Sequence, residues 1–425
     1  MNIGPIQVEL RERARAARLK EVVLASFYEP APSIAARLRE FTLRDWQRAK
    51  YWLDVSGLAL YFLDRMETLK IQSSLPEAFL FQLRTNLAEN RARTASLFHE
   101  AVIITHALRQ RNIECALLKG VTLSPESVRD SSLRNQMDLD LLIRESDARR
   151  VQGCLSEFGY SLDAISGTTW EFKAGLSGTS SLRNLYQVRP ERAVEVHLLP
   201  DQVRNSKSDC LSRSEWRLIN GHSLPSLSSK DLFILQGQHL FKHMCGEHTR
   251  ASWVLEYWRH VSRRWDDAAF WSEVESFAAD DGGSCIAIGA ATLLTSRIFG
   301  PFAPRELTHW SMDELPAGVC QWVHLYGRRI LLSDRAGSKL YLLLRKQLNP
   351  QSAAEKAALR RLFLPLHWPQ RITRASTNES LFRRVRRFWL QVQFTGRRFR
   401  FHAAEGVSLV VESLRWQRRN GGVSQ

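Results

Sequence analysis

The spacing of apolar residues changes twice along the chain, and these changes constrain the fold more than any other feature. Before residue 112 and after Ser229, apolar residues recur every three or four positions, which is typical of amphipathic helices. Between residues 112 and 200, short apolar or alternating runs predict strands. The sequence therefore predicts an α+β fold, in which a small mixed-sheet core is flanked by N- and C-terminal helical regions.

The segment 112–200 carries the signals of individual elements. Strands are expected over residues 113–118, 138–143 and 193–198, helices over 121–128 and 146–158, and a hairpin over 168–173 and 182–188. Ser146 is a suitable N-cap and Gly159 suits the position after a helix. The first helical region is expected to include helices over 8–27, after an N-cap at Thr42, and over 76–110. We divide the chain into a helical region (1–111), an α/β core (112–200), a helical domain (201–363) and a basic tail (364–425).

Composition excludes several classes of protein. The chain has 425 residues, of which 44% are hydrophobic, and 13 Trp with 20 Phe exclude a disordered chain. Six dispersed cysteines form no CxxC motif and predict reduced thiols. The first 25 residues are charged, and the apolar run 285–294 is too short to span a membrane. These features predict a cytoplasmic protein without a transmembrane segment.

The last 55 residues are strongly basic. From Arg371 to Gln425 there are twelve Arg and three Glu, which is +9 of the chain's total of +16. This tail favours contact with a polyanion, either nucleic acid or an anionic membrane surface to which the protein binds peripherally. Residues 382–401 mix arginine with aromatic residues. They fit a helix at a membrane interface, strands that bind nucleic acid, or a helix docked on the helical domain.

Two acids two residues apart are the sharpest chemical feature. Asp138 and Asp140 stand in an apolar run, and in a strand both side chains point to one face. Paired carboxylates among apolar residues are costly unless a cation neutralises them, which indicates Mg²⁺ or Mn²⁺. Glu195 lies in a second alternating run, and three acids on neighbouring strands would bind two metal ions. The alternative is a pair of solvent-facing acids on a half-buried strand.

Further residues suit phosphate binding. Lys119 and Gly120 end the strand before the acids, where glycine lets the backbone approach phosphate and lysine supplies a positive charge. Arg134 precedes Asp138 by four residues. Downstream, His239, His243, Cys245 and His248 could form a zinc site, but their spacing matches no common zinc module, and ordinary helix packing is the alternative.

These motifs together resemble a known family. The runs are LLKG at 117–120, LRNQMDLDLLI at 133–143, FGY at 158–160 and VEVH at 194–197. They resemble the bacterial uncharacterised nucleotidyltransferase family of the DNA polymerase beta-like superfamily, over roughly residues 40–260. HLFKH at 239–243 resembles the family's downstream helix, and WVLE at 253–256 resembles the segment that follows it. This likeness implies that His239, Lys242 and His243 face the active-site cleft or brace it. Glu195 and Glu256 stand where aspartate is common, which changes the reach of each carboxylate.

The resemblance implies transfer of a nucleoside monophosphate from a nucleoside triphosphate (NTP) to an acceptor hydroxyl or phosphate. Asp138, Asp140 and Glu195 would hold the metal ions, and Glu195 would complete the second metal site or act as a base. The phosphates would meet Lys119, Gly120, Arg134 and Lys242. The resemblance does not indicate which molecule is the acceptor. The rival interpretation is a catalytically degenerate fold that serves as a basic binding module for nucleic acid or anionic membranes.

Overall fold

A computed structural model describes residues 5–175, 184–188, 191–279, 281–333, 337–348, 361–362 and 381–421. The chain divides into two compact units. The first consists of Met1–Phe241 and Arg250–Leu315, and the second of Lys242–Thr249 and Pro316–Gln425. Each unit is described by itself, and the four-part division expected from the sequence stays a prediction.

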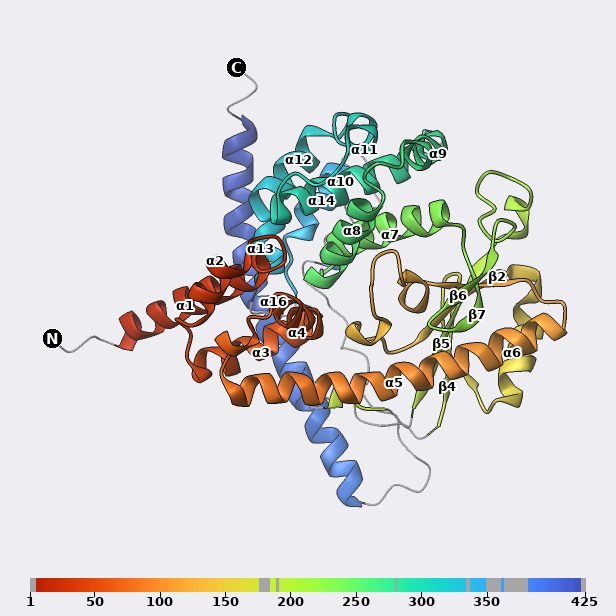
Figure 1. The fold of residues 1–425 in the computed structure, drawn as a ribbon, viewed down its shortest axis with the longest axis horizontal. Helices are drawn as coiled ribbons and strands as arrows, with labels where there is room; N and C mark the ends of the chain where they lie inside the picture. Colours follow the sequence, from red (N-terminus) through yellow and green to blue (C-terminus); the bar gives the residue numbers. More distant parts are fainter. Residues whose placement is uncertain are drawn as a thin grey trace. The chain divides into compact units, whose positions relative to one another are not determined.

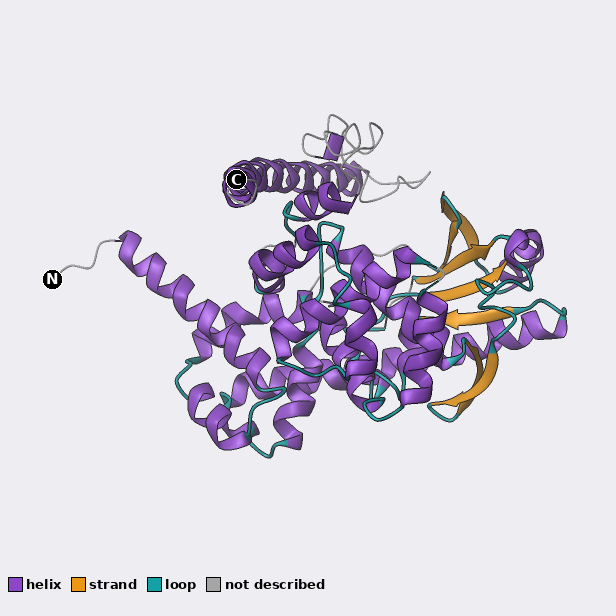
Figure 2. Cartoon of the chain, turned by 90° about the horizontal axis from the view of Figure 1, so that it is seen from above, coloured by secondary structure: helices purple, strands orange, loops and turns teal. Residues whose placement is uncertain are grey.

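A single seven-stranded sheet forms the centre of the first unit (Figure 2, orange). The strands are β1 (Cys115–Leu118), β2 (Leu139–Arg144), β3 (Ser161–Ser166), β4 (Thr169–Ala174), β5 (Arg192–Leu199), β6 (Glu215–Ile219) and β7 (His222–Ser226). Their order across the sheet is β3-β4-β5-β2-β1-β7-β6. The pairs β2–β5 and β1–β7 are parallel and the others are antiparallel. This mixed sheet with helices around it confirms the expected fold class.

Two helices cover one face of the sheet. They are the long α5 (Glu77–Gln110) and α6 (Ala148–Glu157), drawn beside the strands in Figure 1. The core beneath them takes every second residue of β2, namely Leu139, Leu141 and Ile143, which are buried. Because strand side chains alternate between faces, this pattern turns Asp140 to the other face. That face has a smaller apolar cluster around Leu118 and Leu142.

Helices before and after the sheet complete the first unit. The N-terminal ones are α1 (Pro5–Ala25), α2 (Ala31–Leu38), α3 (Leu43–Val55) and α4 (Ala59–Thr68). Thr42 and Asp45 form the capping box that the sequence predicts at the start of α3. The later helices are α7 (Ser229–Met244, which crosses into the second unit), α8 (Ala251–Arg263), α9 (Ala268–Ala278), α10 (Gly282–Phe299) and α11 (Arg305–Ser311).

One of these helices, α10, has the length and apolar composition of a membrane span, but 67% of that span is buried inside the protein. Such burial is common for a core helix. The finding agrees with the interpretation of residues 285–294 as part of a buried helix.

The second unit is helical in its described part. It contains α12 (Ala317–Trp322), a π-helical turn (Val323–Gly327), α13 (Arg328–Leu331), α14 (Tyr341–Leu348) and α16 (Leu381–Gly421). Within the basic tail, residues 381–421 form one uninterrupted helix of 41 residues, drawn in blue in Figure 1. The alternative in which residues 382–401 form strands is wrong. The proline- and arginine-rich stretch 364–373 lies outside the described residues.

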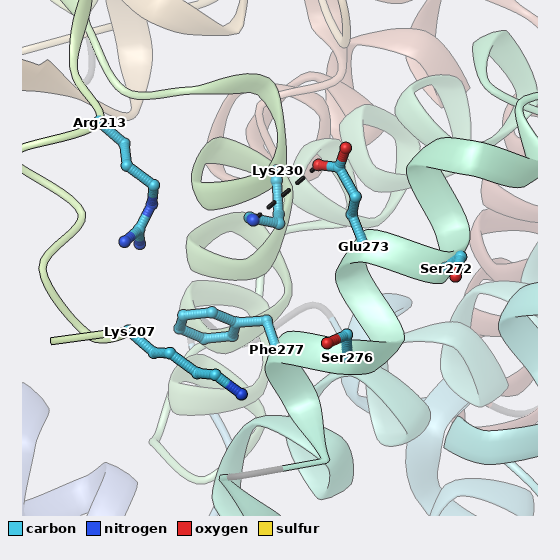
Figure 3. Close-up of a pocket in the computed structure, with 7 residues that line it drawn as sticks. All are labelled: Lys207, Arg213, Lys230, Ser272, Glu273, Ser276 and Phe277. Carbon is cyan, nitrogen blue, oxygen red and sulfur yellow. Dashed lines mark ion pairs between the residues drawn. The ribbon is translucent and has the colours of Figure 1, made fainter.

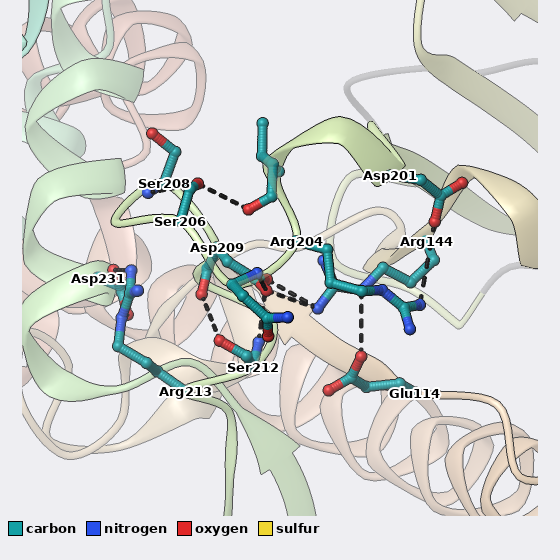
Figure 4. Close-up of polar contacts among 12 residues, drawn as sticks. Glu114, Arg144, Asp201, Arg204, Ser206, Ser208, Asp209, Ser212, Arg213 and Asp231 are labelled. Carbon is teal, nitrogen blue, oxygen red and sulfur yellow. Dashed lines mark hydrogen bonds and ion pairs between the residues drawn. The ribbon is translucent and has the colours of Figure 1, made fainter.

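Buried ion pairs fix the far end of β2 (Figure 4). The guanidinium of Arg144 donates to Asp209 at 2.8 Å and to Glu114 at 3.1 Å. Asp209 also accepts from the backbone amides of Asn205 and Ser212. Burial raises the pKa of Asp209, but these hydrogen bonds outweigh it and lower the pKa overall. The loop after β5 is therefore anchored to the sheet by charge.

Several local expectations differ from the structure. The helix expected over 121–128 is only a 3-10 turn, Gly120–Leu123, because Pro125 holds Ser124 in an extended conformation. Ser146 is not the N-cap of α6, since its hydroxyl donates to Asp201 and α6 begins two residues later. Gly159 does follow the helix with a positive φ of 79°.

The expected hairpin has a different partner. β4 pairs with β3, which precedes it, and residues 184–188 form turns rather than a strand. Residues 182 and 183 lie outside the described part. The strands β6 and β7 were not predicted, because β6 is short and largely exposed and β7, with the sequence HSLPS, contains a proline and no apolar alternation.

Candidate active site

Three carboxylates come from adjacent positions of the sheet. Asp138 directly precedes β2, and Asp140 lies two residues further on the same face. Glu195 of β5 is the direct parallel partner of Asp140 in the sheet register. Burial and the negative charges of Asp140 and Glu195 raise the pKa of Asp138. The fold thus brings the three predicted acids together and leaves their charges incompletely neutralised.

The negative charge of Asp140 is balanced by two neighbouring side chains. Its carboxylate is buried and accepts hydrogen bonds from Lys119 Nζ at 2.6 Å and from His197 Nε2 at 3.0 Å. Burial raises the pKa of Asp140, but the hydrogen bond from His197 and the Lys119 ammonium outweigh burial and lower it overall. Asp140 is therefore held ionised, whereas its neighbour Asp138 resists ionisation.

His197 is a site residue that the sequence analysis did not assign. It lies two residues after Glu195 on the same face of β5, and its Nδ1 lies 3.2 Å from the hydroxyl of Thr169. Potential ligand atoms of Asp140, Glu195 and His197 all lie within 4.8 Å of one another. The spacing from Glu195, which places both side chains on one face, was the available signal.

Lys119 has a strained backbone. Its φ of 51° and ψ of −137° lie in a region that glycine adopts readily and other residues rarely do. This conformation turns the chain sharply out of β1 and accompanies the ion pair with Asp140. Strain of this kind is retained where neighbouring structure enforces it, which is common at functional sites.

Gly120 lies against a neighbouring side chain. A Cβ atom at this position would lie 2.0 Å from the amide group of Gln136. The Gln136 amide in turn donates to the carbonyl oxygen of Asp138 at 2.8 Å. A larger residue at position 120 would displace Gln136 and disturb the backbone that presents Asp138.

Arg134 takes part in a buried network. Its Nε donates to Glu256 at 3.2 Å, and the hydroxyl of Tyr61 donates to the same carboxylate oxygen at 2.8 Å. The side chain of Asn90 on α5 donates to the carbonyl oxygens of Arg134 and Ser132. Arg134 is therefore locked beside the acids, and the sequence analysis did not assign Tyr61 or Asn90.

A role for Lys242 and for the downstream histidines stays a prediction. Lys242 lies in the last turn of α7 and belongs to the second unit, so its part in phosphate binding stays a prediction. The ring of His239 packs edge-on against Trp253 at 5.0 Å, which agrees with helix packing.

A separate pocket of about 300 Å³ lies elsewhere in the first unit (Figure 3). Its walls include Lys207, Arg213 and Lys230, and α9 contributes the Phe277 ring. Asp231 binds both ends of the Arg213 guanidinium, and Glu273 lies 3.9 Å from Lys230. None of the acids at the start of β2 lines this pocket. We therefore assign the chemistry to the group of acids on β2 and β5 instead.

The chain is similar to known proteins at the level of its family. No curated protein matches the chain. Among solved structures, an antigenic nucleotidyltransferase-like protein from Paracoccidioides brasiliensis matches at 14% identity with a TM-score of 0.29, covering 50% of this chain and 95% of its own. A family profile matches residues 42–300, which is more than half of the chain and includes all three acids. The chain therefore belongs to the uncharacterised nucleotidyltransferase family.

Proposed function

We propose that the chain is a metal-dependent nucleotidyltransferase of the DNA polymerase beta-like superfamily. It would transfer a nucleoside monophosphate from an NTP to a hydroxyl or phosphate of an acceptor. The observation that carries this proposal is the convergence of three acids: Asp140 and Glu195 are register partners across β2 and β5, and Asp138, just before β2, lies close enough for both charges to raise its pKa. We further propose that the chain is bacterial and acts in the cytoplasm.

The residues fit a divalent cation. The raised pKa of Asp138, caused by burial and by Asp140 and Glu195, marks excess negative charge that a cation would relieve. Carboxylate oxygens suit Mg²⁺ or Mn²⁺, and His197 adds a nitrogen to the donor set around Asp140. When bound, the cation would neutralise phosphate charge and lower the pKa of the attacking hydroxyl. Asp138, Asp140 and Glu195 would hold it.

The remaining side chains orient and balance charge. Lys119 pairs with Asp140. It would leave Asp140 and contact the triphosphate when the nucleotide binds. His197 orients Asp140 through its Nε2 hydrogen bond. Arg134 supports the acids with its positive charge, while Glu256 holds its guanidinium in place. Gly120 leaves room for the side chain of Gln136. We propose that Gly120 and Lys242 also contact the phosphates.

The reaction balances as a single displacement. The acceptor oxygen forms a bond to the α-phosphorus of the NTP, and the bond from that phosphorus to the oxygen bridging to the β-phosphate breaks. Pyrophosphate leaves with the electron pair of that bond. Where Glu195 acts as the base instead of a metal ligand, the acceptor proton passes to its carboxylate, which is partly exposed and so can return the proton to solvent.

One observation favours the rival function. Asp140 already has a cationic partner in Lys119, and a site that neutralises itself would suit a degenerate fold that only binds. The two functions differ in whether the nucleotide is consumed, so a labelling experiment separates them.

The test uses NTPs labelled at the α- or the γ-phosphate, incubated with the protein, Mg²⁺ or Mn²⁺ and a cell extract. Nucleotidyl transfer predicts that the α-label appears in an acceptor, whereas the γ-label leaves in pyrophosphate. Asp138→Asn should abolish the labelling, and Glu215→Gln, an exposed acid on β6, should retain it. Nucleotide binding without transfer of label to any acceptor would support the rival function.

A further inference from the structure

The helix α16 has two unlike faces along its whole length of 41 residues. One face is buried in the second unit, where Leu409 and Trp416 are only 6% and 5% exposed. The Trp416 ring stacks on Tyr326, and Glu412 accepts from Arg329 at 2.8 Å. These contacts fix which side of the helix faces the protein.

The opposite face is apolar and exposed. At 100° per residue its residues fall within one sector of the helix about 140° wide, so they form one stripe. They are Leu381, Phe382, Val385, Phe388, Trp389, Val392, Phe399, Val407, Val410, Val411 and Leu414, each exposed by at least 42%. More than half of the exposed large apolar residues of the described chain belong to this single helix. A stripe of this size on a folded protein marks a contact surface.

Arginines flank the first half of the stripe. Seven Arg and no acidic residue occur between Leu381 and Ala404. Arg384, Arg386, Arg397 and Arg400 are exposed, whereas Arg398 is paired on the protein side with Glu247 at 2.9 Å. At 100° per residue, Arg384 lies on one edge of the stripe and Arg386 and Arg397 on the other. Cations therefore border the apolar face on both sides.

The apolar centre and the arginine borders of this face decide which kind of partner can bind to it. Two copies joined through their stripes would bring arginine edges together, which like-charge repulsion opposes. A nucleic acid would leave Leu381, Val385 and Val392 against phosphates, because the apolar residues occupy the centre and the cations the edges. An anionic bilayer satisfies both parts: the aromatic and aliphatic side chains enter the acyl boundary, and the arginines reach the headgroups.

We propose that α16 is a membrane-surface helix that binds anionic phospholipid through this stripe and its arginine borders. The helix lies along the bilayer plane, because the apolar face runs from Leu381 to Leu414, about 50 Å at 1.5 Å per residue. The inference is independent of the proposed transferase activity, since no residue of the catalytic group takes part in it.

The test is co-sedimentation of the full-length protein with vesicles of phosphatidylcholine, with or without phosphatidylglycerol. Binding is expected with the anionic vesicles, weaker binding with phosphatidylcholine alone, and a loss of the difference at high salt. Replacing Phe388 and Trp389 together by serine should weaken partitioning at least about tenfold. Replacing Arg384 and Arg386 together by glutamine should weaken it about twentyfold on anionic vesicles only.

The matched control is Phe81→Ser, which alters an apolar residue of α5 that is 72% exposed and lies outside the stripe. It should bind vesicles as the parent protein does. Failure of the parent protein to sediment with anionic vesicles would overturn the proposal, as would full binding by the Phe388 and Trp389 variant. A dimer in light scattering that this variant dissociates, or RNA binding that only the arginine variant loses, would identify a different occupant and also overturn it.

Discussion

At the scale of single residues, Asp138 and Asp140 differ although they are two positions apart. Burial, Asp140 and Glu195 raise the pKa of Asp138. For Asp140, burial also raises the pKa, but His197 and Lys119 reverse the effect and lower it. From the sequence alone the two acids are equivalent, because both stand in the same alternating run. Nothing in that run indicates that Lys119 forms an ion pair with only one of them.

This difference predicts opposite effects on stability. Without metal, Asp138→Asn should raise the free energy of unfolding by about 1 kcal/mol, since it removes a buried and repelled charge. Asp140→Asn should lower it by about 2 kcal/mol, since Lys119 and His197 lose a charged acceptor. Urea unfolding in the presence of a chelator measures both. Equal shifts in the two variants would contradict the charge distribution described above.

The same two variants should agree in activity. Each removes one negative charge from the proposed cation site, and cation stabilisation of the transition state is worth several kcal/mol. Transfer should therefore fall on the order of a thousandfold or more in both.

A buried histidine away from the acids predicts the pH dependence of stability. His260 is fully buried, and its Nδ1 donates to the side-chain oxygen of Gln236 at 2.8 Å. Burial, with nearby Arg264, Arg217 and Arg263, lowers the pKa of His260 to about 3. In the unfolded chain it would protonate near pH 6.5. Between these two values the unfolded state binds the extra proton, so stability falls as the pH falls.

The expected loss is roughly 2 kcal/mol by about pH 5 relative to neutral pH. It is measured as the free energy of unfolding in urea across this pH range. His260→Gln should flatten this part of the profile, because glutamine does not titrate. A variant that keeps the full slope would assign the proton uptake to other groups.

At the scale of elements, α5 is both a cover for the sheet and a support for the site. Asn90, fully buried, donates from α5 to the carbonyl oxygens of Ser132 and Arg134 at 2.6 and 3.0 Å. These bonds hold the segment that leads into Asp138. Asn90→Leu should therefore cost about 2 kcal/mol of stability and also reduce transfer, because two carbonyls lose their donor and the segment loosens.

The control for this prediction lies one turn earlier on the same helix. Asn86 has a buried side-chain nitrogen without a hydrogen-bond partner among the described residues. Asn86→Leu should be neutral or stabilising and leave transfer unchanged. Thermal unfolding and the labelling assay, applied to both variants, decide whether the role of Asn90 depends on its hydrogen bonds or only on its shape.

How well each element could be predicted follows from its surroundings. The helix α5 was predictable because it buries one regular face, and β2 was predictable because it is buried on both faces and so reads as a short apolar run around Asp140. The strand β3 has the sequence SLDAIS and is largely exposed at the sheet edge, so burial imposes no alternation on it. In the site, the acids were recognisable by their apolar flanks. Tyr61 and Glu256, 195 residues apart, meet only through tertiary packing.

At the scale of the whole molecule, the tail is a structural part of one unit rather than a loose extension. The basic charge was plain from the sequence, but a count of arginines does not reveal which face of a helix is buried. The structure shows that α16 supplies Leu409 and Trp416 to the second unit and that Tyr326 and Arg329 contact Glu412. The sheet and the acids belong to the first unit.

Deletion of residues 371–425 should therefore affect the two units differently. The second unit would lose the partners of Tyr326 and Arg329, and removal of Trp416 alone is expected to cost about 3–5 kcal/mol. Hydrogen exchange should accordingly speed up in α12 and α14, whereas amides of α5, β2 and β5 should keep their protection, since their core lies within the first unit.

Trp416→Ala should reproduce the effect in part, and Leu414→Ala, on the exposed face, should change stability by less than about 0.5 kcal/mol. Loss of protection throughout the sheet on deletion would mean that the two units fold as one, and unchanged protection in α12 and α14 would mean that α16 contributes nothing to the second unit's stability.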